Sequence, residues 1–444
     1  RERRAPSFEP YHLTEEPNVS RLLFRSAACA GLMLALLSFG CRDKWDVSGH
    51  PVKDEELDSA FFAGLNSVEI PDVPEPQRLR PCCIFGNDVG VSVGHVPVPG
   101  YEVRNVLDID ELGTHNYNNG LVSLQRPEEG RVVSDEASGI LYTCRGGFID
   151  IAHVRDNADR TLYLIAQIGR LAASGGTIPL VSEGAERRIV VRPLDPVLIR
   201  AHGAREVIVI LAEWIDFQAS IWHEIATWYN WSSTSFSERP SAFSPEDLYS
   251  NLIGAKIAGA VVRRHAAASE HAYNLSVTAF LKDALVKLGP LPKDASRRAF
   301  AYVDGIWWDS TRRVPDNRLV RHRNFDIGPK LYPWKLKDAQ VSEALAAAGQ
   351  EFDEACGGDW TPLGLNVPDR IGDVPFRQLA TLEIRPDEVL ARNGFVLPRG
   401  GSNLVTQDDF PALIRAIARA ADAELGAGAG LPAARLDEAP HHGR

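Results

Sequence analysis

The segment of residues 206–228 constrains the fold more than any other part of the chain, because apolar side chains lie on nearly every face of a helix built from it. A helix that is apolar all round needs other elements to cover all of its faces. Its β-branched start, residues 207–211, would equally suit a strand. We favour the helix and predict that it is buried at the centre of the fold.

An adjacent histidine and glutamate, His223 and Glu224, lie near the end of this segment. The pair resembles the start of the zinc-protease pattern His-Glu-x-x-His, in which two histidines one helical turn apart bind the metal and the glutamate handles the proton. Thr227 stands where the second histidine would be. The standard zinc-protease interpretation therefore fails, and any metal site must take ligands from elsewhere.

The segments that precede the central helix predict a small amount of sheet. Residues 139–144 have the pattern of a short strand, and helix-like spacing follows over residues 149–171. Residues 177–182 and 188–193 are two apolar runs separated by a short polar turn, which predicts a hairpin.

Further helices are expected over residues 245–267, 275–288, 294–302 and 408–425. The first of these has a strong opening signal, because Ser244 can cap it and proline and acidic residues follow in the first turn. The expected fold class is therefore α+β, a helix-rich single large domain with a minor sheet or hairpin.

The N-terminal part of the chain has the form of an export signal. An uncharged apolar run, residues 26–40, follows Arg21 and Arg25 and ends directly before Cys41. This resembles the bacterial lipoprotein signal, in which the cysteine is lipidated, although Phe39 is bulkier than the usual residue. The run is shorter than the roughly 20 residues that span a membrane, and an uncleaved N-terminal anchor is the alternative. We expect a membrane-anchored lipoprotein at the periplasmic face of a bacterial cell envelope.

The remaining organisation follows from composition. A translation start at Val19 would give the signal a typical length, so residues 1–41 are interpreted as an upstream extension plus a signal. Residues 42–90 are polar and Pro-rich, which predicts a tether. Residues 91–425 would form the domain, and residues 426–444 a disordered Gly/Ala/Pro tail.

The charge balance limits the partners. The chain has 48 basic and 59 acidic residues and a net charge of −11, which argues against a nucleic-acid binder that relies on phosphate neutralisation. The expected partners are the membrane, through a lipid anchor at Cys41, and an unidentified substrate or protein.

Three histidines in polar surroundings, His115, His153 and His223, are candidate ligands for one divalent metal ion, with zinc as the expected ion. Glu224 or Asp156 would act as general base on a metal-bound water. The alternative is a fully hydrogen-bonded polar network that locks two helices together and is chemically inert.

The predicted helix start at residues 244–247 offers further candidates. Glu246, Asp247 and Asn251 could add a carboxylate or amide ligand from one helical turn. A helix cap and a packing face are the simpler explanation of these residues.

A different chemistry would use Cys144 as a nucleophile, because it ends a predicted strand ahead of a helix whose N-terminus could stabilise a thiolate. His153 or His115 would be its base, as in cysteine hydrolases and acyltransferases. Against this, an exported cysteine can simply be bridged. Cys82, Cys83 and Cys356 are the other cysteines that would remain after export, and their pairing stays open.

Three blocks of sequence together resemble a bacterial family catalogued only as domain-of-unknown-function family 4056. The blocks are Thr143-Cys-Arg-Gly-Gly-Phe-Ile-Asp-Ile-Ala-His-Val-Arg-Asp156, Trp222-His-Glu-Ile-Ala-Thr-Trp-Tyr229 and Phe243-Ser-Pro-Glu-Asp-Leu-Tyr-Ser-Asn-Leu252. The resemblance covers most of the chain after the tether and implies an envelope setting. It implies no activity and no catalytic residue.

The leading functional hypothesis from the sequence is a metal-dependent hydrolase that acts on an envelope substrate. The alternative is a non-catalytic envelope lipoprotein in which the same residues form a structural network, and a Cys144-dependent hydrolase or acyltransferase is third. Convergence of the three imidazoles on one point would favour the metal hypothesis, because metal–nitrogen bonds are about 2 Å long.

Overall fold

The computed structural model describes residues 72–77, 79–80, 83–93, 96–119, 136–233, 237–336, 352, 354–358, 361–398 and 403–425. All of them lie in one compact unit, Trp45–Arg444. The expected signal with Cys41, the first part of the expected tether and the expected tail lie outside the described residues.

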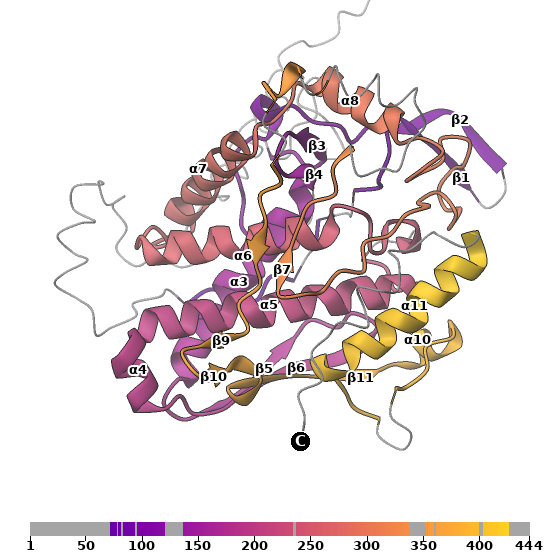
Figure 1. Ribbon diagram of the computed structural model, residues 1–444. Helices are drawn as coiled ribbons and strands as arrows, with labels where there is room; N and C mark the ends of the chain where they lie inside the picture. Colours follow the sequence, from indigo (N-terminus) through magenta and orange to yellow (C-terminus); the bar gives the residue numbers. More distant parts are fainter. Residues whose placement is uncertain are drawn as a thin grey trace, which may run out of the picture. The chain divides into compact units, whose positions relative to one another are not determined.

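Three long helices form the centre of the fold: α3 (Ile151–Leu171), α5 (Ala204–Trp228) and α6 (Asp247–Arg263). Each of them contacts the other two. Helix α5 is buried along most of its length, and Figure 1 shows it between α6 and the sheet that contains β6 and β11. The prediction of a buried central helix is therefore confirmed.

Helices α3 and α6 pack unusually closely. A Cβ atom added to Gly254 of α6 would collide with the main-chain oxygen of Val154 in α3. Only glycine permits this approach, because every other side chain would push the two helices apart. The close contact places the first turn of α3 opposite the first turns of α6.

The main sheet has four antiparallel strands in the order β12–β11–β6–β5. Strands β5 (Gly176–Leu180) and β6 (Ala185–Val191) form the predicted hairpin. Strand β11 (Ala380–Pro386) pairs with the whole of β6. Strand β12 (Val405–Thr406) pairs with the other edge of β11. Alternate residues of β6 are buried, as expected of a strand with one face on the core.

A second antiparallel pair, β3 (Ile140–Thr143) and β4 (Gly147–Asp150), leads directly into α3. The predicted strand is confirmed, but helix α3 begins at Ile151 because residues 147–150 complete the hairpin. The hairpin is tied to the end of α7 (Glu270–Leu288), where the Cys144 N–H donates to the Gly289 carbonyl at 2.8 Å.

The remaining elements surround this core. The helices are α4 (Pro196–His202), α8 (Lys293–Tyr302), α10 (Glu388–Arg392) and α11 (Phe410–Leu425). The strands are β1 (Val89–Val93), β2 (Val96–Val103), β7 (Lys330–Leu331), β8 (Leu365–Asn366), β9 (Arg370–Ile371) and β10 (Val374–Pro375). The described residues thus have the predicted α+β fold with a helix-rich core. None of their helices is both long and apolar enough to cross a membrane.

Helix α6 opens differently from the prediction. Ser244 does not cap it, because its hydroxyl donates to the Ser241 carbonyl at 2.8 Å. Its N–H instead donates to Oδ2 of Asp247 at 2.6 Å, and the helix begins at Asp247. This turn holds Glu246 and Asp247 inside the protein rather than at its surface.

The predicted tether extends too far toward the C-terminus. Val73, Arg80 and Phe85 are buried in the domain, and Arg80 contacts carboxylates of α3. A free tether would leave these side chains in water. The folded part therefore includes Val73 and does not begin at residue 91.

Candidate metal site

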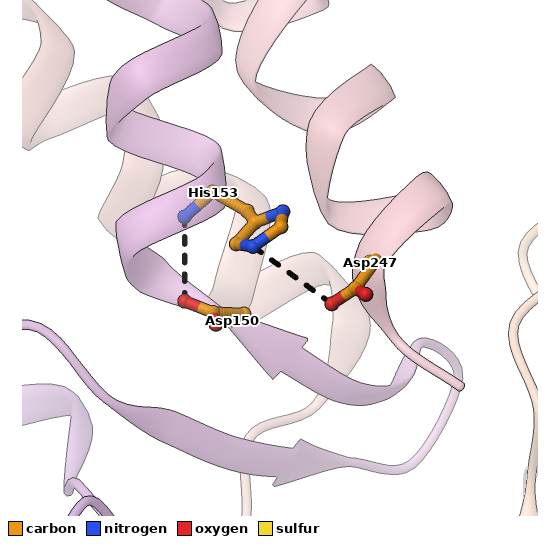
Figure 2. Close-up of side chains that lie close together, drawn as sticks. All are labelled: Asp150, His153 and Asp247. Carbon is orange, nitrogen blue, oxygen red and sulfur yellow. Dashed lines mark hydrogen bonds and ion pairs between the residues drawn. The ribbon is translucent and has the colours of Figure 1, made fainter. Parts of the chain in front are cut away.

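Two carboxylates and one imidazole meet where α3 and α6 begin. Asp150 caps α3, and its Oδ1 accepts the N–H groups of Ala152 at 2.7 Å and His153 at 3.3 Å. His153 lies in the first turn of α3, and Asp247 is the first residue of α6. One potential ligand atom from each of Asp150, His153 and Asp247 lies within 4.8 Å of the other two, and Figure 2 shows the three side chains side by side.

The two ring nitrogens of His153 face different groups. Nε2 lies 3.9 Å from Oδ1 of Asp247, and Figure 2 shows that ring nitrogen directed at the carboxylate. Nδ1 lies 2.8 Å from Oδ1 of Asn251 and 3.9 Å from Oε1 of Glu224. Nε2 is therefore the nitrogen that faces Asp247.

Four buried carboxyl groups surround His153. Asp150, Glu224, Glu246 and Asp247 are each no more than 2% exposed. Burial lowers the pKa of His153, but Asp247, Asp150 and Glu224 together raise it to about 10. Burial raises the pKa of Glu246 well above its usual range, and the charge of Asp150 raises it further. With Glu246 protonated, Asp150, Asp247 and Glu224 face His153, and Asp247 and Glu224 also face the buried Arg323 guanidinium. A divalent cation would relieve the remaining repulsion between the carboxylates.

Two glutamates of this site have oxygens with no hydrogen bond from another described residue. They are Oε1 of Glu224 and both carboxylate oxygens of Glu246. Oε2 of Glu224 accepts the N–H of Phe243 at 2.8 Å, and Phe243 has the left-handed backbone conformation with φ of 56°. Buried polar atoms without partners and a strained non-glycine residue are both typical of functional sites.

His223 lies beside this group but turns toward another carboxylate. Its ring centre is 6.1 Å from that of His153, and its Nδ1 is 3.3 Å from Oε2 of Glu183. Burial raises the pKa of Glu183, but Arg187 and His223 lower it by more, to about 2. His223 is therefore oriented by an ionised Glu183.

His153 and His223 line the same small pocket, together with Ser220 and Asn157. Its volume of about 20 Å³ is enough for about one water molecule. The pocket gives water access to the edge of the candidate site.

His115 belongs to a separate polar cluster, defined here as the Arg80 cluster: Arg80, His115, Glu136, Asp156 and Asp159. Nε2 of His115 lies 2.8 Å from Oδ1 of Asp159. The Arg80 guanidinium, whose side chain is completely buried, contacts Glu136 at 2.5 Å, Asp156 at 2.7 Å and Asp159 at 3.0 Å. The structure thus brings His153 and His223 together but gives His115 different partners.

Asp156 also belongs to the Arg80 cluster. Its carboxylate accepts the Arg80 main-chain N–H at 2.9 Å as well as the guanidinium. Burial raises its pKa to about 6, and Arg80 opposes that rise. Because Arg80 occupies both of its oxygens, Asp156 is less suited than Glu224 to act as a base.

The sequence profile of the family described as "protein of unknown function (DUF4056)" matches residues 70–337. The chain belongs to this family. No curated protein and no solved structure matches the chain significantly. The DUF4056 segment contains Asp150, His153 and Asp247, the three helices of the core and the Arg80 cluster, so the whole candidate site lies within the family region.

The prediction that Cys144 is a nucleophile is wrong. Cys144 forms a disulfide with Cys356, and their Cα atoms are 5.7 Å apart. A disulfide sulfur has no thiolate with which to attack a substrate. The bond instead joins the DUF4056 segment to the C-terminal part of the chain, outside residues 70–337.

Sequence analysis missed Asp150 and treated Asp247 as a secondary candidate. The available signal for Asp150 was an aspartate three residues before His153, at a junction of strand and helix where an N-cap is expected. In the structure Asp150 caps α3 through Oδ1, and one of its carboxylate oxygens belongs to the candidate site.

Proposed function

We propose that this DUF4056 protein is a metal-dependent hydrolase whose ion is held by Asp150, His153 and Asp247. The observation that carries the proposal is the buried group in which the potential ligand atoms lie within 4.8 Å of one another. Imidazole and carboxylate ligands suit zinc and other divalent ions, and three protein ligands leave a position for water. The buried carboxyl groups around His153 support the same proposal.

A bound divalent ion would lower the pKa of a coordinated water and polarise a substrate carbonyl or phosphoryl group. Glu224 is the general base in this proposal, because Phe243 holds its Oε2 and leaves Oε1 with no hydrogen bond from the described residues. The pocket beside His153 and His223 is the side from which water would enter.

A non-catalytic envelope protein is the second candidate. The observation in its favour is the small volume of the pocket, about 20 Å³, which holds one water but not a substrate group. In that case the ion would stabilise the junction of α3 and α6 without turnover.

The experiment that separates these candidates uses the purified chain after removal of metal with a chelator. Zinc, manganese and magnesium are titrated by calorimetry, and hydrolysis of ester, phosphoester and amide substrates is measured with and without each ion. We expect about one ion per chain and hydrolysis that a chelator abolishes. Binding without hydrolysis of any substrate class would contradict the hydrolase, and a Kd weaker than about 1 mM for every ion would contradict the metal site.

We also propose that the protein is anchored to the bacterial envelope through a lipid on Cys41, with its domain at the periplasmic face. The support is the apolar run of residues 26–40 with Arg21 and Arg25 before it and Cys41 after it. In a bacterial host fed a palmitate analogue, Cys41→Ser is expected to abolish lipid labelling. Cys29→Ser, inside the same run, is the matched control and should be labelled normally. Labelling of the Cys41→Ser protein would contradict the anchor.

A further inference from the structure

A continuous chain of hydrogen bonds leads from Asp216 in α5 to the ring of His153. Nε of Arg160 donates to Oδ1 of Asp216 at 2.5 Å, and NH2 of Arg160 donates to Oδ1 of Asn157 at 2.7 Å. Nδ2 of Asn157 donates to Oδ1 of Asn251 at 2.6 Å. That same oxygen lies 2.8 Å from Nδ1 of His153.

The direction of each bond follows from the chemistry of the groups. Arginine has only donors, so the atom of Asn157 that meets Arg160 must be its carbonyl oxygen. The amide nitrogen of Asn157 also lies 2.8 Å from the main-chain oxygen of His153, which can only accept. Both ends of the Asn157 side chain are therefore fixed, and its Nδ2 must donate to Asn251.

Asn251 then has one possible orientation. Its Oδ1 receives the Asn157 donor, and its Nδ2 has no hydrogen-bond partner among the described residues. Nothing at the nitrogen end competes with the orientation set at the oxygen end. The Asn251 carbonyl faces Nδ1 of His153, so Nδ1 carries a proton and donates it in a hydrogen bond.

We propose that Asn157, supported by Arg160 and Asp216, is a positioning residue that makes Nε2 of His153 the metal ligand. When an ion binds, the imidazolium would lose its Nε2 proton to solvent and keep the Nδ1 proton, which leaves the Nε2 lone pair for an ion between Asp150 and Asp247. Metal-bound histidines are commonly oriented by a hydrogen bond from the other ring nitrogen to a carbonyl or carboxylate. This inference rests on the proposed metal site and adds four residues that contact no ligand.

Two Asn→Asp substitutions, which keep the shape of the side chain and add one negative charge, distinguish this positioning role from an effect of charge alone. In Asn157→Asp, residue 157 can no longer donate, so the Asn251 amide is expected to turn over and point its N–H groups at the new carboxylate and at Nδ1. In the neutral ring Nδ1 must then accept, and the ring proton lies on Nε2. In Asn251→Asp, the new carboxylate still accepts from both Asn157 and Nδ1 of His153, so each hydrogen bond keeps its direction.

Both variants add one negative charge near the ion, and charge alone would strengthen binding in both. The positioning role instead predicts that Asn157→Asp weakens zinc binding on the order of 10-fold. Asn251→Asp should bind zinc at least as tightly as wild type. Calorimetric titration of the full chain measures both values, and thermal melting in chelator verifies that each variant is folded.

A second readout does not depend on metal. In ¹⁵N spectra of the metal-free protein recorded above pH 10, where the His153 ring is neutral, we expect an Nδ1–H signal that Asn251→Asp keeps and Asn157→Asp loses. A folded Asn157→Asp protein that keeps this signal and binds zinc as wild type does would overturn the inference. If wild type binds no ion but shows the protected Nδ1–H signal, the proposed function fails and the positioning of the ring stands. If wild type lacks that signal, the inference fails regardless of metal.

Discussion

Asp150→Asn is expected to weaken divalent-cation binding by at least about 100-fold without loss of metal-free stability. Oδ1 of Asp150 accepts the N–H groups of Ala152 and His153, and an asparagine oxygen can do the same, since asparagine and aspartate are equally good helix caps. The substitution changes only the second oxygen, which becomes an amide nitrogen that cannot bind a cation.

Removing this buried charge should not destabilise the metal-free protein. Burial raises the pKa of Asp150, which His153 and Cys83 lower only in part, so its charged form is costly in the absence of an ion. Calorimetric titration with zinc and thermal melting in chelator measure the two effects separately.

Asp387→Asn is the matched control for this variant. Asp387 caps α10 by accepting the N–H groups of Val389 at 2.8 Å and Leu390 at 3.1 Å, the same geometry as at Asp150. It lies outside the metal group, so its substitution should leave zinc affinity unchanged. Equal affinities of the Asp150→Asn protein and the control would remove Asp150 from the site.

Arg80→Met is expected to cost about 3–5 kcal/mol of unfolding free energy, as is typical when one partner of a buried ion pair is removed. Methionine has a similar length but no charge. The carboxylates of Glu136, Asp156 and Asp159 would then lose the cation they share. Urea unfolding in the presence of chelator measures the loss without a contribution from bound metal.

Arg170→Met provides the comparison at the surface. Arg170 pairs with Asp72 and so joins α3 to the same N-terminal segment that Arg80 holds, but the two side chains are 45% and 81% exposed. Exposed ion pairs contribute about 0–1 kcal/mol. A loss at Arg80 no larger than the loss at Arg170 would show that the Arg80 cluster contributes little to stability.

Local patterns were sufficient for most helices and for one hairpin. The run over residues 206–228 became α5, because a segment that is apolar all round has no stable alternative to burial. The β5–β6 hairpin followed from two short apolar runs beside a turn. Strand β11 was not foreseen, since its partner β6 lies far away in sequence and no local signal records that pairing.

The candidate site was only partly predictable for the same reason. His153 was recognised as a histidine in polar surroundings and Glu224 as a carboxylate in an apolar helix, and both lie at the site. His115 has the same local signature but is paired with Asp159. No feature of the sequence near His115 distinguishes these two environments.

The sequence by itself determined the helix-rich α+β class, the buried central helix and the presence of polar residues within it, because these depend on hydrophobic periodicity and capping over a few residues. Tertiary structure alone decided which carboxylates meet His153. Asn251, the hydrogen-bond partner of His153, is 98 residues away in the chain. The two meet because Gly254 allows α3 and α6 to approach closely, and a contact of that kind depends on the packing of whole helices rather than on neighbouring residues.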